Sequence, residues 1–287
     1  MLRELGAADF LAFTAAYRQA DPIATNQIAG FAMAATDTTE SRFWAVLEGD
    51  DVTGIAMFKP SRGVMLTTSV SPGDASILAL DVVSSVDGIV VFITGSSASV
   101  QAFIEAYTRA HPCKIEAHWT QDVVLYAMDD DLNVDSRRFQ GRMRLANAAT
   151  DYELLIKWIH ALDESIKALP RGEIFIHEGL KRQSLFIWEV DGVPVAFGGH
   201  YPAVNIGNER VVRLGPIFVD VSHRRKGYGS ALTVAAIQHL RETSSMPPRF
   251  CLSTDASNVA SNKAYQNIGF VMHSRSTRFG LRTAEEP

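Results

Sequence analysis

An apolar run at residues 211–219 is followed by the basic sequence HRRKGYGS at residues 223–230, and then by an Ala- and Leu-rich run at residues 231–240. The apolar run is typical of a buried strand, and the spacing of the Leu and Ala residues is typical of an amphipathic helix. A loop that opens a helix leaves the amides of the first turn without partners, beside the positive end of the helix dipole. Such a place binds phosphate groups.

The residues of this loop support the same interpretation. Gly227 and Gly229 let the backbone turn tightly and approach a ligand without a Cβ in the way. The side chains of Arg224, Arg225 and Lys226 add positive charge that is complementary to phosphate. The sequence therefore predicts a phosphate-binding loop at the start of a helix.

Two other phosphate loops do not fit. The sequence contains no G-x-x-x-x-G-K-[ST], and the glycines do not form G-x-G-x-x-G, so neither a nucleoside-triphosphatase loop nor a dinucleotide fingerprint is predicted. A phosphate-binding kinase is also disfavoured by the lack of a clear magnesium carboxylate set. We expect Tyr228 to face the core or to cover the turn. A basic surface loop that only caps a helix is the simpler alternative.

The positive charge of this loop is local, because the chain as a whole is acidic. Its formal net charge is −5 and its pI is near 5.9, whereas a nucleic-acid binder needs basic surface over much of a domain. The two cysteines, Cys113 and Cys251, form no C-x-x-C motif, so we predict no disulfide framework and no metal site. Both thiols are expected to be buried and reduced.

Nothing in the sequence predicts a membrane partner. Charged residues interrupt the first ten positions before a signal-peptide core could form. The uncharged stretch at residues 88–104 is too short and too polar for a membrane helix. We expect a soluble, cytoplasmic protein.

The same order of elements occurs twice along the chain. The polar segment at residues 129–138 divides it near the middle, and we place one domain at residues 1–132 and a second at residues 139–287. Each is expected to be a mixed central β-sheet flanked by helices, an α/β (α+β) fold. At the position that corresponds to the basic loop, residues 71–74 (SPGD) have no cation and no second glycine.

One residue of the apolar run does not suit a fully paired strand. Pro216 has no amide hydrogen to donate, so part of this strand should lack a ladder partner. Arg213 is the only charged residue within residues 211–219. An extended ligand could dock along the unpaired part.

Residues 211–240 resemble the acyl-CoA-binding motif of the GNAT superfamily of N-acyltransferases, in which a strand is followed by Arg/Gln-x-x-Gly-x-Gly/Ala and a helix. Arg224, Gly227 and Gly229 occupy the three fixed positions. The resemblance covers roughly residues 141–282, and the upstream half looks like a degenerate copy, as in tandem members of the superfamily.

A second motif follows at the distance expected for this family. Asn258, Tyr265 and the pair Gly269 and Phe270 match its Asn…Tyr…Gly-Phe spacing. The resemblance implies that Tyr265 is the general acid beside the sulfur of acetyl-CoA and that Asn258 contacts this co-substrate. From the residues alone, Tyr265 would be a core aromatic on a helical stripe.

The resemblance further implies a set of contacts to acetyl-CoA by strand and loop residues. These are Ile217, Phe218, Val219, Arg224, Arg225, Lys226, Gly227, Tyr228, Gly229 and Ser230.

Aminolysis of a thioester requires a neutral amine, and an amine with a pKa of about 10.4 is mostly protonated at pH 7. Some members of the family use a glutamate on a central strand as the base, and residues 211–219 contain none. The alternatives are His200, Glu173, His177, Asp220 or deprotonation through water.

The sequence thus predicts an acetyl-CoA-dependent N-acetyltransferase that transfers an acetyl group to a primary amine of a small molecule or peptide, without a metal. A non-catalytic acyl-CoA-binding or regulatory module is the alternative from another class. We expect a monomer or homodimer. Glu164, Glu173, Glu178 and Trp188 would suit a cationic acceptor if they faced a cleft.

Overall fold

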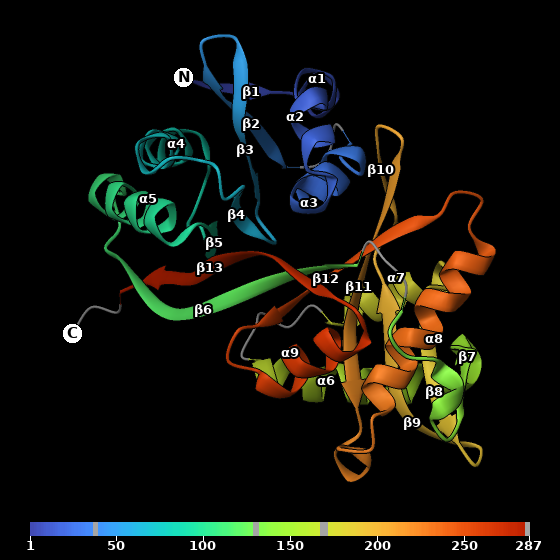
Figure 1. The fold of residues 1–287 in the computed structure, drawn as a ribbon. Coiled ribbons are helices and arrows are strands. Elements are labelled where there is room, and N and C mark those ends of the chain that lie inside the picture. The colour runs from blue at the N-terminus through green and yellow to red at the C-terminus, as the bar shows by residue number, and fades with distance from the viewer. Residues whose placement is uncertain (37–39, 129–131, 167–171, 285–287) are drawn as a thin grey trace.

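The computed structural model describes residues 1–36, 40–128, 132–166 and 172–284, apart from the side chains of residues 165 and 166 (Figure 1). The first three residues of the segment at 129–138, on which we placed the domain boundary, lie outside these ranges.

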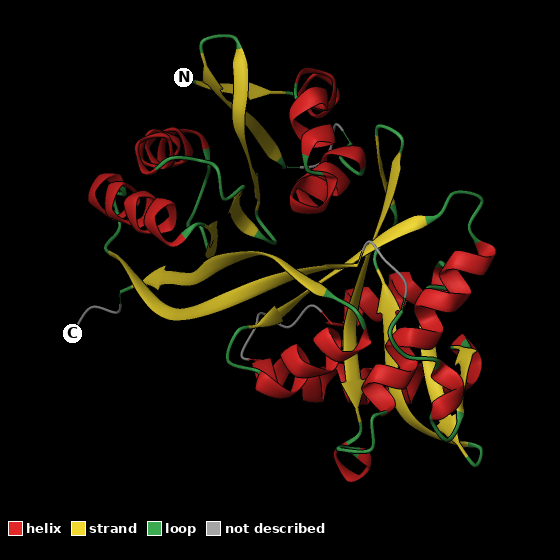
Figure 2. Cartoon of the chain, in the orientation of Figure 1, coloured by secondary structure: helices red, strands yellow, loops and turns green. Residues whose placement is uncertain are grey.

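The strands form one continuous, strongly twisted sheet that runs through both halves of the molecule (Figure 2). In chain order they are β1 (Leu2–Leu5), β2 (Arg42–Glu48), β3 (Asp51–Lys59), β4 (Gly63–Leu66), β5 (Phe92–Gly95), β6 (Ile115–Met128), β7 (Arg142–Leu145), β8 (Leu185–Val190), β9 (Val193–His200), β10 (Val204–Ile206), β11 (Glu209–Val219), β12 (Pro248–Asp255) and β13 (Val271–Thr283).

Helices cover both faces of this sheet. They are α1 (Ala7–Phe13), α2 (Ala15–Ala20), α3 (Pro22–Met33), α4 (Pro72–Ser85), α5 (Ser97–Ala110), α6 (Ala148–Ile166), α7 (Gly172–Lys181), α8 (Tyr228–Thr243) and α9 (Val259–Ile268), with 3₁₀ turns η1 (Ser136–Arg138) and η2 (Val221–His223).

The order of strands in space confirms the predicted tandem α/β architecture. It runs β1-β2-β3-β4-β5-β13-β6-β12-β11-β9-β8-β7, with β10 paired to β11. The two halves therefore repeat the same arrangement from opposite ends of the sheet. In each half, a helix connects two neighbouring parallel strands: α4 connects β4 to β5, and α8 connects β11 to β12.

The two halves exchange their last strands. The final strand of the first half, β6, pairs with β12 of the second half from Val123 to Met128. The final strand of the chain, β13, pairs with β5 of the first half from Thr277 to Gly280. Because β6 and β13 also pair with each other along most of their lengths, they form the centre of the sheet.

Each half has a hydrophobic core on either face of its part of the sheet. In the first half, α4 and α5 cover one face and α1 and α3 cover the other. In the second half, α8 and α9 cover one face, while α6 and α7 cover the other. None of these helices, in the part of the chain described above, is long and apolar enough to cross a membrane.

Helix α3 joins the two halves and was not predicted. Asp21 caps its first turn by accepting a hydrogen bond from the amide of Ala24, and Pro22 stands at its first position. Its Ile23 packs in a cluster with Val211 and Cys251 of the second half. The apolar residues of α3 therefore face both halves and do not form one simple stripe.

One further expectation needs correction. Cys113 is exposed, just outside α5, and only Cys251 is buried; both are free thiols. The residues after Phe270 form one long strand, β13, with two register shifts.

Candidate functional site

The loop between β11 and α8 has the backbone that its glycines predict. Gly227, the N-terminal cap of α8, has φ +82°, and Arg225 has φ +64°. A positive φ at Gly227 carries no Cβ penalty, whereas Arg225 is held in a conformation that side chains rarely adopt. Tyr228 is 7% exposed and packs in the core under α8, as predicted.

The amides of this loop are free to bind a ligand. The first hydrogen bond into α8 runs from the amide of Ala231 to the carbonyl of Gly227 at 2.9 Å. Gly227 has no side chain to cap the helix. Within the described residues, the amides from Arg225 to Ser230 have no hydrogen-bond partner, so the N-terminus of α8 presents several donors and the positive end of the dipole.

The three cations of the loop are exposed but do not point the same way. The Arg224 Nε atom donates to the carbonyl of Val219 at 3.2 Å, and its guanidinium lies 5.6 Å from the ring centroid of Phe218. Arg224 thus folds back along β11. Arg225 and Lys226 are exposed beside the free amides, where they add positive charge.

Close packing leaves no room for a side chain at Gly227. A Cβ there would lie 2.8 Å from Cε1 of Phe139. At Gly229 a Cβ would be in ordinary contact with Cγ2 of Val219, at 3.4 Å, because the first turn of α8 packs against the end of β11. The close approach of Phe139 to the loop thus depends on Gly227.

Asp220 holds the strand-to-loop connection. Its Oδ1 accepts hydrogen bonds from the amide of Ser222 at 3.0 Å and from its hydroxyl, and its Oδ2 accepts one from Trp158 Nε1 at 3.2 Å. These hydrogen bonds, the one from the Ser222 hydroxyl above all, lower the pKa of Asp220 to about 2. Asp220 is therefore a poor base.

The last part of the strand before the loop, residues 217–219, is paired on one side only. Strand β11 pairs with β12 from Arg210 to Arg213. Beyond that point, in the described part of the sheet, it pairs with β9 alone, after a register shift between Leu214 and Ile217 that contains the cis peptide before Pro216. The backbone of residues 217–219 thus has an open edge, as expected from Pro216.

Tyr265 lies on α9, beside the splay, the place after Arg213 where β11 and β12 part. Its ring contacts those of Tyr126 and Phe270, at centroid distances of 6.4 Å and 6.0 Å, and packs against the core cluster that holds Val212 and Leu214 of β11. Burial raises the pKa of Tyr265 to about 12. Among the described residues its hydroxyl has no hydrogen-bond partner, so the group is neutral and free to donate.

Asn258 has a structural role at the start of α9. Its side-chain oxygen accepts a hydrogen bond from the amide of Ser261 at 3.0 Å, which caps the helix. Its contact with acetyl-CoA, implied by the resemblance, stays a prediction.

The other candidate bases are engaged elsewhere. His200 is held by a contact from Nδ1 to the carbonyl of Tyr201 at 2.8 Å, and burial lowers its pKa. Glu173 is paired with His160 at 2.6 Å, and His177 lies 3.1 Å from the hydroxyl of Tyr152. No single residue stands out as the base.

The corresponding place in the first half is closed. Helix α4 begins at Pro72, which has no amide hydrogen, and Ser71 caps it by accepting a hydrogen bond from the amide of Asp74 at 3.1 Å. Asp74 adds negative charge to the same turn. Among the described residues, the N-terminus of α4 therefore presents fewer free donors than that of α8, and its first turn, residues 71–74, has no cation.

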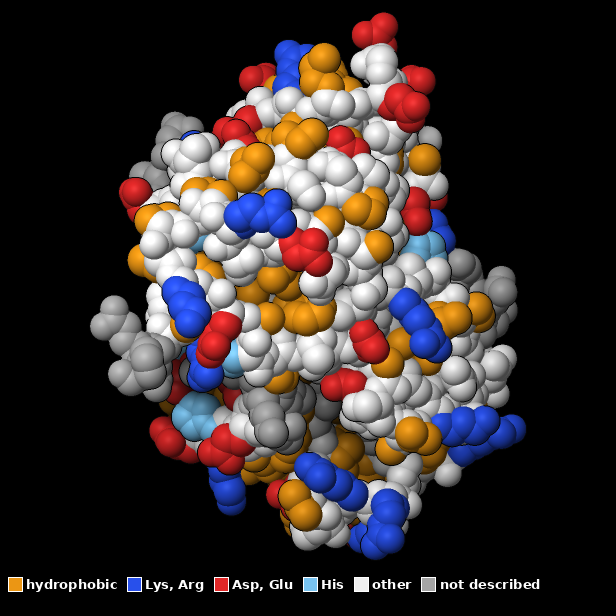
Figure 3. Space-filling model, turned by 90° about the vertical axis from the view of Figure 1, so that its left-hand side faces the viewer, with side chains coloured by type: hydrophobic (Ala, Val, Ile, Leu, Met, Phe, Trp, Pro, Cys, Tyr) orange, Lys and Arg blue, Asp and Glu red, His pale blue; other side chains and the backbone are white. Residues whose placement is uncertain are grey.

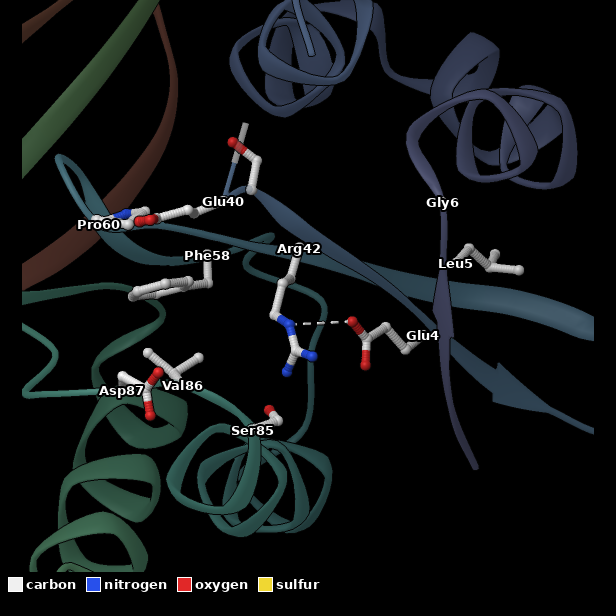
Figure 4. Close-up of a pocket in the computed structure, with 11 residues that line it drawn as sticks. Glu4, Leu5, Gly6, Glu40, Arg42, Phe58, Pro60, Ser85, Val86 and Asp87 are labelled. Atoms are coloured by element: carbon white, nitrogen blue, oxygen red, sulfur yellow. Dashed lines mark ion pairs between the residues drawn. The ribbon is translucent and has the colours of Figure 1, made fainter. Parts of the chain in front are cut away.

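A separate cavity of about 660 Å³ lies at the other end of α4 (Figure 4). The ion pair between Arg42 and Glu4, at 3.3 Å, stands in its wall, with Phe58 and Asp87 on the other side. All its lining residues belong to the first half, so this cavity is distinct from the loop at α8.

Charge on the surface is mixed. On the face in Figure 3, which is seen from the left of Figure 1, Lys and Arg side chains are interspersed with Asp and Glu. In the described residues, no group of three or more His, Cys, Asp and Glu is arranged to hold a metal ion.

Comparison with known families identifies the second half. Residues 152–270 match the model of the acetyltransferase (GNAT) family. The C-terminal half is a GNAT acetyltransferase domain. Its match begins within α6 and includes β11, the basic loop, α8 and α9, so the predicted motifs lie inside it.

Solved structures extend the likeness to the whole chain as a fold. A tandem GNAT protein from the clavulanic acid biosynthesis pathway matches with a TM-score of 0.57 at 11% identity, covering 100% of both chains. A GCN5-related N-acetyltransferase from Sphaerobacter thermophilus matches with a TM-score of 0.58 at 13% identity, covering 99% of this chain and 95% of the other. A GNAT-family acetyltransferase from Colwellia psychrerythraea matches with a TM-score of 0.55 at 15% identity, covering 98% and 100%. No curated protein matches the sequence.

Proposed function

We propose that the second GNAT domain is an acetyl-CoA-dependent N-acetyltransferase that acts on a primary amine of a small molecule or peptide. One observation carries the proposal: the free, cationic N-terminus of α8 adjoins the open edge of residues 217–219. The first feature suits a diphosphate, and the second suits the amide-rich pantetheine arm, which can pair with it as another strand would.

The residues of the loop suit the phosphate groups of coenzyme A. The amides from Arg225 to Ser230 would hold the diphosphate, and Arg225 and Lys226 would neutralise its charge. Arg224 would support the loop from behind through its hydrogen bond to Val219. The missing Cβ at Gly227 makes room for the ring of Phe139, which packs against the loop.

In the reaction, the nitrogen of a neutral amine attacks the thioester carbonyl carbon, and the carbon–sulfur bond breaks. The hydroxyl of Tyr265 gives its proton to the departing thiolate, and the amine loses a proton to water. The high pKa of Tyr265 keeps it protonated for this step. No metal or covalent enzyme intermediate is needed.

We assign the upstream half a structural role, with residues 1–132 as the degenerate domain and 139–287 as the catalytic one. The support is the contrast between two helix N-termini: α8 has free donors and cations, and α4 has a serine cap, a proline and an acid.

The proposal is tested by calorimetry with acetyl-CoA, followed by release of free thiol across a panel of amines. We expect binding and turnover by the parent protein. Binding without turnover on a broad panel would favour the non-catalytic module, and no heat of association with any acyl-CoA would remove the proposed activity.

A further inference from the structure

Three arginines from distant parts of the chain gather where the two halves meet. Arg62 belongs to the turn between β3 and β4, Arg213 to β11, and Arg278 to β13. Each lies within the electrostatic reach of the others: the charge of Arg213 acts on Arg62, and the charges of both act on Arg278. We call them the arginine triad.

The triad occupies the face of the sheet that α3 covers. Val211, two residues before Arg213 and so on the same face of β11, packs on Ile23 of α3. The guanidinium of Arg62 lies 5.8 Å from the ring centroid of Phe31, also on α3. Helix α3 touches β11 and β13, so it brings the first half to the edge of the second.

Arg278 points to the same face. Its Nε donates to Oγ1 of Thr94 on the neighbouring strand at 3.2 Å. The residue before Thr94, Ile93, packs in the opposite core, under α4 and α5. Alternation along the strand therefore directs Thr94, and Arg278 with it, toward the face of α3.

No acid in the described part of the chain neutralises the triad. Within the described residues, none of its three members forms an ion pair with Asp or Glu. By contrast, Arg144 is held by both Asp151 and Glu189, at 2.6 Å and 2.5 Å. Burial lowers the pKa of Arg62 and Arg278, and the like charges lower it further. Partly buried positive charges without counter-ions are costly, so an anion is the missing partner.

The triad adjoins the proposed reaction site. Arg213 is the last residue of β11 that pairs with β12, and the strands part immediately after it. Ile217, where the open edge begins, is four residues further, about 13 Å along an extended strand. The guanidinium of Arg213 lies 4.0 Å from the ring centroid of Tyr201, whose ring contacts Phe175 of α7.

The two faces of the splay carry different groups. Val212 and Leu214, which alternate with Arg213, face α8, α9 and Tyr265. Arg213 faces the opposite side, toward Tyr201 and α3. A thioester held between the parted strands would thus be flanked by Tyr265 on one side and by the triad on the other.

We propose that the arginine triad binds an oxyanion of the acceptor, so that the amine substrate carries a carboxylate or a phosphate group. This inference rests on the proposed acetyltransferase function. Of the four residues that would suit a cationic acceptor, Glu173 pairs with His160, Glu178 pairs with Lys181, and Trp188 is buried, whereas Glu164 is exposed on α6. The three engaged or buried residues give little support to a cationic acceptor.

Guanidinium groups suit this task because their planar N–H donors match the two oxygens of a carboxylate or phosphate. The diphosphate of coenzyme A is already assigned to the N-terminus of α8 by the proposed function. The triad lies on the other side of the open edge from that site and is therefore left for the acceptor.

The first experiment compares matched amines in the thiol-release assay with acetyl-CoA. Glycine is paired with glycinamide, and O-phosphoethanolamine with ethanolamine, so each pair differs in its anionic group. We expect kcat/KM about 10- to 100-fold higher for the anionic member of a pair, the range of one charged hydrogen bond. A preference for glycine would indicate a carboxylate, and one for O-phosphoethanolamine would indicate a phosphate. Equal or better turnover of both neutral members would overturn the inference.

The second experiment uses Arg62→Gln and Arg278→Gln, with Arg275→Gln as the control. Arg275 is exposed on the same strand as Arg278 and lies outside the triad. We expect the two triad variants to raise KM for the anionic amine about tenfold or more and to leave acetyl-CoA affinity unchanged, whereas Arg275→Gln changes neither. Equal effects of all three variants would contradict a specific subsite.

A third readout does not require turnover. Succinate and inorganic phosphate are titrated into the full chain by calorimetry, and we expect heat from one of them that Arg62→Gln removes. Because each triad member is repelled by the others, Arg62→Gln should leave the melting temperature unchanged or raise it. If acetyl-CoA binds but neither succinate nor phosphate does, the triad proposal is wrong while the acetyltransferase proposal stands. If acetyl-CoA does not bind, the acetyltransferase proposal itself is wrong.

Discussion

The ring of Phe139 lies so close to Gly227 that a Cβ there would be 2.8 Å from Cε1 of the ring. Phe139 follows η1, between the two halves of the chain, whereas Gly227 caps the helix that begins the proposed diphosphate site. Phe139, at the start of the second domain, thus packs against the loop between β11 and α8.

Gly227→Ala should weaken acetyl-CoA binding by tenfold or more, because the new Cβ displaces either Phe139 or the loop. Gly88→Ala is the matched control, since Gly88 has nearly the same φ, +80°, and nothing within 4 Å. Both variants carry the backbone cost of a left-handed residue, about 1–2 kcal/mol in the free energy of unfolding. Calorimetry and thermal melting separate the two effects, and equal loss of affinity in both would contradict the role of Phe139.

Tyr265→Phe should lower kcat by about 100-fold or more and leave acetyl-CoA affinity unchanged. Its melting temperature should change little, because the lost hydroxyl has no hydrogen-bond partner among the described residues. Tyr126→Phe is the opposite control: it removes a hydrogen bond to Asn262 at 2.9 Å, so stability should fall while kcat is retained. A parent-like kcat in Tyr265→Phe would exclude the phenol as the acid.

The pH dependence of kcat should reflect the raised pKa of Tyr265. Burial favours the neutral phenol up to about pH 12, so kcat should not decline between pH 8 and pH 10 through loss of the acid. Because burial penalises the phenolate, the folded protein keeps its full stability below about pH 10, the unfolded pKa, and loses stability as pH rises through about 12. A descending limb of kcat near pH 9, with the fold intact, would indicate another acid.

Asp220→Asn should weaken acetyl-CoA binding about three- to tenfold at pH 7, because the bonds to Ser222 and Trp158 lose their charged acceptor. The pKa of Asp220 is depressed, so its contribution to stability is present above about pH 3.8 and is lost as pH falls through about 2. Thermal melts of the variant should depend less on pH in that window. Glu178→Gln is the control, since Lys181 also lowers the pKa of Glu178, and α7, which carries it, covers the opposite face of the sheet from α8.

The two thiols should react differently with iodoacetamide at pH 8. Burial raises the pKa of Cys251 to about 11, so its thiol stays protonated and covered, whereas Cys113 is exposed. Mass spectrometry should find one label on the native protein and two after unfolding in denaturant. Labelling of native Cys113→Ser would contradict the burial of Cys251.

Local features of the fold could be predicted from the sequence. The strand, loop and helix around Gly227 are encoded by neighbouring residues, and the hairpin turn at Asp191 and Gly192 sets the bounds of β8 and β9. The buried position of Tyr228 and the closed turn at Ser71 follow from similarly short-range patterns.

Long-range features could not be predicted in this way. Helix α3 is apolar toward both halves, so its pattern has no single period to detect, although the cap at Asp21 and Pro22 marks its start. The arginine triad was missed because only Arg213 lies in a recognised motif; Arg62 and Arg278 join it through pairing across β4, β5 and β13.

Because β6 and β13 are exchanged, each half of the sheet depends on the other half for one of its strands. When the ribosome releases the first 132 residues, β5 still has no neighbour on one side, because that neighbour, β13, follows the rest of the second half in the chain. The upstream half can therefore complete its folding only after the second half has been synthesised. A protease that cut the chain between the halves would not separate them, because each fragment would still contain a strand at the centre of the shared sheet.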